Sequence, residues 1–286
     1  MRRVAVATSA GDDFDEEIDP DAHLLLDALA DVDIDGQLCV WDDDAVSWSD
    51  YELVVIRSTW DYTKDRPGFL EWARSLPTLC NPYSIIEYST DKHYLLDLES
   101  RGHRIIPTTF CDVGATPVFP DSKFVVKPTI GAGSVDADKY DAGEHRVAAS
   151  HVARLHDSGR DAMIQPYVAS VDEVGERGMV FIDGAFSHAI RKGAMLHVDQ
   201  LDRHSLFRLE QLSLADAEPD AVTFAESVMA EPRFNGLLYA RVDLVQVPDG
   251  WAIMELELVE PSLFLSFDAD ADAAAHLASA ISERLG

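Results

Sequence analysis

The sequence is poor in basic side chains, and this scarcity excludes one class of function. Its 286 residues include 23 Lys and Arg against 52 Asp and Glu, so the formal net charge is −29. A surface that binds nucleic acid needs clustered Lys and Arg to neutralise the phosphates. We therefore expect no nucleic-acid partner for this chain.

Cysteines and long apolar segments are also scarce. The three cysteines, Cys39, Cys80 and Cys111, form no CxxC pair and are odd in number, which is typical of a reducing cytoplasm. No apolar run approaches the ~20 residues of a membrane-spanning helix, and the N-terminal MRRVAVATSAGDDF favours a first strand over a signal peptide. We expect a cytoplasmic protein without a membrane partner, and leave open whether it forms a homodimer.

The acidity does not indicate disorder, because 47% of the residues are hydrophobic and 9% are aromatic. So many carboxylates repel one another unless salt screens them, and the Debye length falls to ~3 Å at 1 M salt. We predict a halophilic protein that loses its folded state in low salt. An ordinary acidic enzyme from a mesophilic host is the alternative.

The first ninety residues alternate between strand and helix patterns. Apolar runs at 4–8, 38–41 and 53–56 predict strands, while Asp19-Pro20 and Arg66-Pro67 are typical helix starts. This alternation predicts a small, mostly parallel sheet of the Rossmann-like kind.

The rest of the chain favours antiparallel strands. An Asp-Gly turn between the apolar runs of 179–190 and a Pro-Asp-Gly turn within 237–259 predict two hairpins. Helices are predicted at 91–101 and 143–157, whereas 195–215 shows no clear period. The expected class is α/β, with an α+β second half.

The second hairpin carries an unusual set of charges. A strand period of two puts Arg241 and Asp243 on one face of the first strand, and Glu255 and Glu257 on one face of the second. If the strands pair, three carboxylates and an arginine converge, which suits Mg²⁺ bridging a polyphosphate. A solvated polar sheet face is the alternative.

A second cluster joins a lysine to a glycine-rich turn. Lys127 ends the strand FVVKP and precedes the sequence TIGAGS, which offers backbone N–H groups to phosphate oxygens. The turn is neither a Walker A loop nor a dinucleotide fingerprint, so a plain surface loop is the alternative. Lys92, Lys127 and Lys192 are three of only six lysines in the chain, and an ATP site in so acidic a protein needs local positive charge.

The ordered set of these motifs, over roughly residues 80–265, resembles the ATP-grasp superfamily. The motifs are DK at 91–92, VVKP, the glycine-rich turn, QPYV at 165–168, Glu176, RVD at 241–243 and ELE at 255–257. The resemblance implies an ATP-grasp fold with a pre-ATP-grasp domain at 1–89, an ATP-grasp domain at 90–286 and a lid subdomain at about 108–168.

The resemblance also implies a role for each matching residue. The ATP-binding set would be Lys92, Lys127, Gly131, Gly133, Ser134, Gln165, Pro166, Tyr167, Val168 and Glu176. The hinge at 165–168 would meet adenine and Glu176 the ribose. Arg241 and Lys192 would be catalytic, and Asp243, Glu255 and Glu257 would hold two Mg²⁺ ions, with Mn²⁺ as the alternative metal. Many relatives have Glu-x-Asn instead of Glu-x-Glu, which leaves open whether Glu257 or Glu260 completes the metal site.

Three further segments are similar to the O-ureido-serine cyclo-ligase branch, which closes the cycloserine ring. They are RSTWDY at 57–62, GAFSHAIRK at 184–192 and ELELVEPSLFL at 255–265. The branch implies an amino-acid-like substrate, with Arg57, Trp60, Asp61, His188 and Glu260 as candidate contacts. A structural role at a domain interface is the alternative for the first three.

The function that follows is a Mg²⁺-dependent, ADP-forming carbon–nitrogen ligase. ATP would convert a carboxyl or carbamoyl-type group into an acyl phosphate, and a nitrogen nucleophile would displace phosphate. Ring closure within one molecule and ligation of two molecules both stay open. The rivals are a kinase that stops at phosphoryl transfer and a regulatory ATP-binding protein with this fold.

Overall fold

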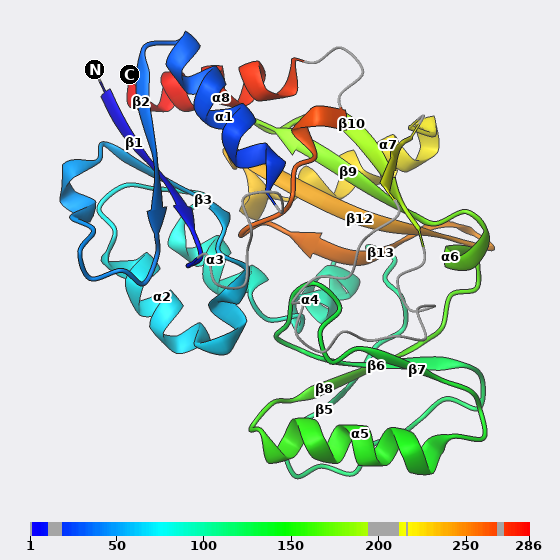
Figure 1. Cartoon of the computed structure of the whole chain (residues 1–286). Helices are drawn as coiled ribbons and strands as arrows, with labels where there is room; N and C mark the ends of the chain where they lie inside the picture. The colour runs from blue at the N-terminus through cyan, green and yellow to red at the C-terminus, as the bar shows by residue number, and fades with distance from the viewer. Residues whose placement is uncertain (1, 11–18, 194–211, 216, 268–271) are drawn as a thin grey trace.

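The computed structural model of the chain describes residues 2–10, 19–193, 212–215, 217–267 and 272–286. Its strands form three sheets, with helices packed against them (Figure 1). The segment 195–215, which has no sequence period, lies almost wholly outside the described residues.

A four-stranded parallel sheet forms the N-terminal part, as the alternation of patterns predicts. Its strands in spatial order are β2 (Ile34–Val40), β1 (Arg2–Thr8), β3 (Leu53–Ser58) and β4 (Leu79–Cys80). Its helices are α1 (Pro20–Asp31), α2 (Arg66–Ser75) and α3 (Tyr83–Ser89). The predicted starts of α1 and α2 are confirmed. β2 begins at Ile34 rather than at Leu38, because the chain turns sharply at Asp33, where φ is 60°.

A five-stranded antiparallel sheet forms the centre. Its strands in spatial order are β11 (Leu212–Leu214), β10 (Ala185–Lys192), β9 (Glu176–Ile182), β12 (Tyr239–Val247) and β13 (Gly250–Glu257). Both predicted hairpins are confirmed, β9–β10 and β12–β13. Asp183 and Gly184 have φ values of 51° and 77°, the left-handed conformations that a two-residue hairpin turn of the primed type requires.

Three helices precede or connect the strands of the central sheet in the sequence: α4 (Tyr94–Ser100), α6 (Ser170–Glu173) and α7 (Pro219–Met229). The helix that the sequence predicts from residue 91 begins at Tyr94 instead. Asp91 accepts hydrogen bonds from the backbone N–H of His93 and contacts the His93 ring, so these residues form a turn before the helix. α4 and α7 supply apolar side chains to one buried cluster with β12 and β13.

The third sheet is smaller and lies at the bottom of Figure 1, with one long helix beneath it. Its strands in spatial order are β5 (Thr109–Cys111), β8 (Ala162–Pro166), β6 (Phe124–Pro128) and β7 (Asp138–Tyr140). The helix α5 (His145–Asp157) buries Ala148, Val152 and Leu155 against it. This sheet spans the segment predicted as a lid, although the division into domains stays a prediction.

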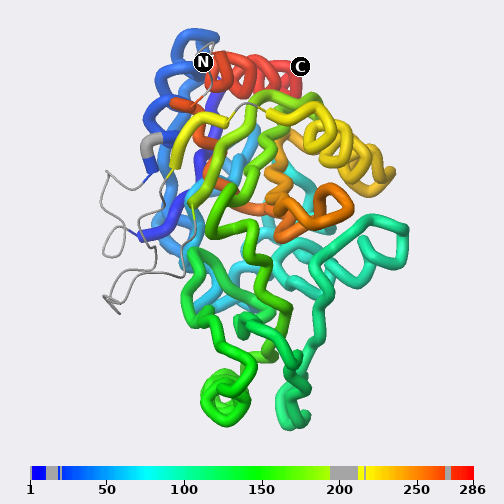
Figure 2. Tube along the Cα trace, turned by 90° about the vertical axis from the view of Figure 1, so that its right-hand side faces the viewer, coloured from blue at the N-terminus to red at the C-terminus, as the bar shows by residue number. Residues whose placement is uncertain are grey.

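The C-terminal helix α8 (Ala273–Leu285) connects the N-terminal and central sheets through a shared core. Leu277 and Ile281 of α8 pack with Leu25 and Leu29 of α1 and with buried residues of β1, β9 and β12. Figures 1 and 2 put both chain ends at this end of the molecule, where the Arg2 side chain donates to the carbonyl of Gly286. Complete burial of one such Leu or Ile contributes about 1.5–3 kcal/mol. Within the described residues, no helix is both long enough and apolar enough to cross a membrane.

Candidate active site

A pocket of about 480 Å³ lies where residues of the three sheets meet. This volume is within the range of small-molecule sites. The N-terminal part supplies Trp60 and Tyr62, the small sheet supplies Lys127 and the hinge at 165–168, and β9, β10, β12 and β13 supply charged side chains. Of the residues expected from the sequence, the following line it: Trp60, Lys92, Lys127, Gly131, Gly133, Ser134, Gln165, Pro166, Tyr167, Val168, Glu176, Lys192, Arg241, Glu255, Glu257 and Glu260.

The β12–β13 hairpin brings its charges together through its register. Arg241 lies opposite Glu257, and Asp243 lies opposite Glu255, as the period of two predicts. The register then shifts, because Leu244 pairs with Ile253 and Met254 is left as an extra residue. Such a bulge re-aims side chains, and here both Met254 and Glu255 line the pocket.

Asp243 is the most deeply buried carboxylate of the hairpin, with 1% of its surface exposed. The Arg241 guanidinium donates to both of its oxygens at 2.8 and 3.0 Å, and Lys192 Nζ donates at 2.7 Å. Burial raises the pKa of Asp243, but Arg241 and Lys192 outweigh burial and lower it to about 2. Asp243 is therefore ionised at neutral pH and holds both cations in place.

Two other acidic residues of the pocket, Glu257 and Glu260, have a raised pKa instead. Burial raises the pKa of Glu257 to about 7, although Arg241 donates a hydrogen bond to it, and the nearby Asp243 and Glu255 add to the rise. Burial and the charge of Glu257 raise the pKa of Glu260 to about 8. Added positive charge beside Glu257 and Glu260 would favour their ionised forms and lower both pKa values.

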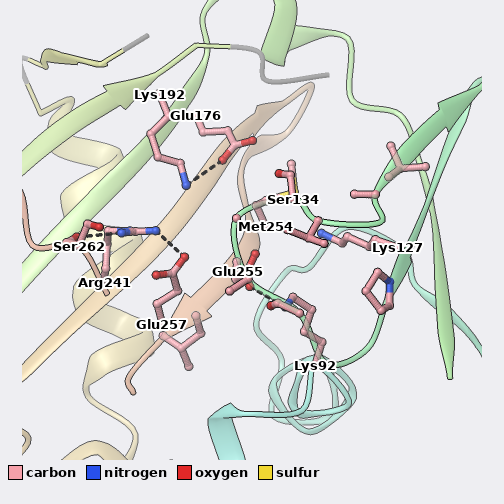
Figure 3. Close-up of a pocket in the computed structure, with 18 of the residues that line it drawn as sticks. Lys92, Lys127, Ser134, Glu176, Lys192, Arg241, Met254, Glu255, Glu257 and Ser262 are labelled. Carbon is pink, nitrogen blue, oxygen red and sulfur yellow. Dashed lines mark hydrogen bonds and ion pairs between the residues drawn. The ribbon is translucent and has the colours of Figure 1, made fainter. Parts of the chain in front are cut away.

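Lys92 and Lys127 face the hairpin from the other side of the pocket (Figure 3). Lys92 Nζ is 2.9 Å from Glu255 Oε1 and donates to the carbonyl of Gly131 at 2.8 Å. Burial raises the pKa of Glu255, but Lys92 and Lys127 outweigh it and lower the pKa overall. Burial lowers the pKa of Lys127, which an anionic ligand at this position would reverse.

The glycine-rich turn and the hinge complete this side of the pocket. Gly133 and Ser134 both have φ of 58°, a conformation that costs glycine little and a serine more. Gln165 donates its side-chain amide to Thr108 Oγ1 at 2.8 Å, and residues 165–168 line the pocket. Glu176 Oε2 lies 3.5 Å from Lys192 Nζ, at the end of the pocket where β9 and β10 pair.

The chain is similar to known proteins in sequence and in fold. Residues 4–81 match the family described as D-cycloserine synthetase DcsG, N-terminal domain. The chain is 38% identical to the cycloserine biosynthesis protein DcsG of Streptomyces lavendulae, over 94% of this chain and 95% of the relative. The chain belongs to the DcsG family of ATP-grasp ligases.

Solved structures agree with this membership of the DcsG family. The crystal structure of D-cycloserine synthetase DcsG matches 99% of this chain and 100% of its own, with 34% identity and a TM-score of 0.87. D-alanine–D-alanine ligase from Bacillus anthracis in complex with ATP matches 100% of this chain and 97% of its own, with 14% identity and a TM-score of 0.69, which shows a shared fold. The expected ATP-grasp fold is confirmed, and the DcsG-family chain is an ATP-dependent, ADP-forming ligase.

Three candidate substrate residues of the DcsG-family chain lie outside the described pocket lining, whereas Trp60 is part of it and donates to the carbonyl of Glu260 at 3.0 Å. Arg57 is 1% exposed and lies 3.5 Å from the carboxylate of Asp21. Asp61 accepts a hydrogen bond from the Trp41 indole at 2.8 Å. His188 Nε2 lies 2.9 Å from the carbonyl of Leu263. Of these three side chains, Arg57 acts through Asp21 and His188 acts directly on the segment at 262–265.

The residues that the sequence did not single out include Asp21, Met254, Ser262 and Phe264. Met254, Ser262 and Phe264 line the pocket, and Asp21 holds the segment that contains the last two. The sequence carries no local signal for Asp21, which contacts residues more than 240 positions away. Ser262 and Phe264 fall in the ELELVEPSLFL motif, so that motif was the available signal for them.

The donor set suits Mg²⁺ in chemistry, although the carboxylates are divided among the cations. Within the described residues, no three acidic, histidine or cysteine side chains cluster closely enough to hold a metal ion by themselves. Mg²⁺ in nucleotide sites usually takes one or two carboxylates and completes its shell with phosphates and water. Glu255 and Glu257 lie on one face of β13, and each has one oxygen at a cation, Lys92 or Arg241. They fit that requirement better than Asp243, whose two oxygens already hold Arg241 and Lys192.

Proposed function

We propose that this chain is a Mg²⁺-dependent ligase that activates the carboxyl group of an amino-acid-like substrate with ATP and closes a ring through a nitrogen of the same molecule. The observation that carries the proposal is the charged lining of the pocket: Arg241 and Lys192 share the buried Asp243, while Lys92 and Lys127 face Glu255. Phosphoryl transfer from ATP to a carboxylate brings two anions together. The pocket supplies cations that offset their charge and oxygen ligands that could hold Mg²⁺ between them.

In the proposed ATP complex, the triphosphate lies between Lys127 and the β12–β13 hairpin. Lys92 and Lys127 contact the phosphates, and the turn at 131–134 donates backbone N–H groups to them. The hinge at 165–168 meets adenine. The ribose lies near Glu176, and ATP binding then competes for the contact that Glu176 makes with Lys192.

Glu255 and Glu257 would hold the Mg²⁺ ions, with Asp243 or Glu260 as further ligands. Bound Mg²⁺ neutralises charge on the phosphates during transfer. We propose two Mg²⁺ ions at this site, with Mn²⁺ as the alternative metal. Added positive charge next to Glu257 would also remove the repulsion that raises the pKa of this carboxyl group.

The substrate that fits the proposal is O-ureido-serine, because the relatives carry the names cycloserine biosynthesis protein and D-cycloserine synthetase. Its carboxylate attacks the γ-phosphorus, forming a C–O–P bond and releasing ADP. The nitrogen bound to the side-chain oxygen then attacks the acyl carbon, the C–N bond forms, the C–O bond to phosphate breaks, and the nitrogen's proton is lost. Attack of water on the carbamoyl carbon would then break its bond to the ring nitrogen, release carbamic acid, which decomposes to CO₂ and ammonia, and give cycloserine.

The chain's own side chains would supply position and charge rather than a nucleophile. Arg241 and Lys192 would stabilise the transferred phosphoryl group, since both line the pocket, from β12 and β10 on either side of β9, and are held by Asp243. Trp60 would close the substrate end and keep water from the acyl phosphate. Ligation of two molecules and activation of a carbamoyl-type oxygen are the alternative outcomes.

The test is release of ADP with Mg²⁺ at high KCl, measured for both enantiomers of O-ureido-serine and for other amino acids and amines, with mass spectrometry of the product. We expect ADP and a cyclised product in equal amounts with one enantiomer. Lys127→Met and Asp243→Asn should abolish turnover, whereas the matched control Lys64→Met, at an exposed lysine outside the pocket, should retain it.

Turnover that survives both pocket substitutions would refute the proposed site. Tight ATP binding without turnover of any compound would favour the regulatory rival, and ADP without a cyclised or ligated product would favour the kinase. The proposed partner is a small-molecule substrate, and the proposal includes no nucleic acid and no membrane. The proposed setting is the cytoplasm of a salt-adapted host.

A further inference from the structure

The first helix touches the active site through one buried carboxylate, Asp21. Asp21 lies in the first turn of α1 and has 2% of its surface exposed. It accepts three hydrogen bonds from successive backbone N–H groups of Leu263 at 2.7 Å, Phe264 at 2.7 Å and Leu265 at 2.8 Å. These three groups belong to the segment that follows β13, at the other end of the chain.

The segment that Asp21 holds is strained. Phe264 has a φ of 53°, a left-handed backbone conformation that is an outlier for a bulky residue. Such a conformation persists only where surrounding contacts compensate its cost. The three charge-assisted hydrogen bonds of Asp21 flank Phe264 on both sides and supply that compensation.

The same segment holds Arg241 in place from the other side. The carbonyl of Ser262 accepts a hydrogen bond from Arg241 Nη1 at 2.8 Å (Figure 3), and the Phe264 ring centre lies 5.3 Å from the Arg241 guanidinium carbon. Asp243 accepts a hydrogen bond from Nε of the same guanidinium, and Glu257 accepts one from Nη2. The carbonyl and the ring therefore complete the set of contacts that orients Arg241 toward the pocket.

We propose that Asp21 is a positioning residue for phosphoryl transfer, which holds residues 262–265 in the strained conformation that aims Arg241. The inference rests on the proposed function, because it takes Arg241 as the side chain that stabilises the transferred group. Asp21 itself touches neither ATP nor substrate in this proposal. Its effect reaches the reaction through the Ser262 carbonyl and the Phe264 ring alone.

Arg57 distinguishes this role from simple stabilisation. It lies 3.5 Å from Asp21 and packs over the Tyr239 ring, and its Nε and Nη1 atoms are buried without a hydrogen-bond partner among the described residues. Asp21→Asn would leave this guanidinium without its counter-charge and lower stability. Asp21→Asn combined with Arg57→Met removes both charges, so it restores stability without restoring the hydrogen bonds to residues 263–265.

The first experiment measures the turnover number, the KM for ATP, ATP binding by calorimetry and the melting temperature in Asp21→Asn, Arg57→Met and the double variant. The control is Asp27→Asn, an exposed carboxylate on the same helix. We expect Asp21→Asn to lower the turnover number about 10- to 100-fold, since a small misplacement of a catalytic group has effects of this size, with ATP binding within about twofold of wild type. The double variant should regain melting temperature and stay as slow as Asp21→Asn. Recovery of turnover together with stability would overturn the proposal.

A double-mutant cycle with Arg241→Lys makes the second test. If Asp21 acts through Arg241, Asp21→Asn should slow the Arg241→Lys enzyme by less than about twofold, because the contact that it supports is already lost. Effects that multiply would overturn the proposal while leaving the role of Arg241 intact. An Arg241→Lys enzyme as fast as wild type would refute the proposed role of Arg241 and the inference together.

Discussion

Replacing Asp243 with asparagine should lower the stability of the metal-free protein by about 2 kcal/mol at neutral pH. Asparagine keeps the shape of the side chain but removes the charge that Arg241 and Lys192 share. The pKa of Asp243 is lowered from 3.8 to about 2 in the folded protein. One pKa unit corresponds to about 1.36 kcal/mol, so the shift is equivalent to about 2.5 kcal/mol of stabilisation.

The sign of this contribution fixes its pH dependence. A carboxyl group whose pKa is lowered in the folded state stabilises the protein at pH values above the pKa that the group has in the unfolded chain, which is near 4. The contribution is lost as the pH falls through about 2, and roughly 1 kcal/mol of it is gone by pH 3. The difference in stability between wild type and Asp243→Asn should therefore be largest near pH 7 and about half as large at pH 3.

The assay is urea denaturation in EDTA and high KCl at pH 7, 5 and 3, with Asp27→Asn as the exposed control. EDTA ensures that the measured state is metal-free, and high KCl screens the remaining carboxylates. The control should differ from wild type by less than about 0.5 kcal/mol at every pH. An Asp243→Asn protein as stable as wild type at pH 7, or a difference that does not shrink by pH 3, would refute the reasoning.

Three further predictions follow from buried polar groups and from net charge. Asn81→Leu should lower the free energy of unfolding by about 3 kcal/mol or more, because the Asn81 side chain makes hydrogen bonds with three buried backbone groups, of Leu238, Tyr239 and Leu258. Urea denaturation measures this loss beside the exposed control Asn235→Ala, and a loss no larger than that of the control would contradict the prediction. Glu260 has a pKa raised from 4.5 to about 8, so its folded-state proton stabilises the metal-free protein at low pH and the gain is lost as the pH rises through 8. The melting temperature in EDTA should fall from pH 5 to pH 9 less in Glu260→Gln than in wild type, and equal slopes would contradict this. Dialysis into millimolar salt should lower the melting temperature sharply because of the net charge of −29, and an unchanged value would remove the halophilic interpretation.

The charged face of the second hairpin could be predicted because its causes are local. A strand period of two and a short turn at Pro248 to Gly250 are enough to put Arg241 opposite Glu257 and Asp243 opposite Glu255. The parallel N-terminal sheet followed from the same kind of local pattern. The bulge at Met254 was not predictable, since nothing in the sequence marks where the register shifts.

Contacts between distant parts of the chain explain the remaining differences. Asp21 and Leu263 are 242 residues apart, and no periodicity connects them. Arg57 and His188 stand in motifs that match a family, but a motif match gives no direction for a side chain. The structure turns Arg57 toward Asp21 and His188 toward the carbonyl of Leu263, so both support the segment at 262–265.

Transfer of a labelled oxygen tests carboxyl activation most directly. Wild-type protein would be supplied with ATP, Mg²⁺ and O-ureido-serine labelled with ¹⁸O at both carboxyl oxygens, and the released phosphate would be examined by ³¹P NMR. Attack of the carboxylate on ATP and loss of phosphate from the acyl carbon predict one ¹⁸O atom in each phosphate. Unlabelled phosphate released together with a cyclised product would contradict the acyl phosphate and the role proposed here for the pocket.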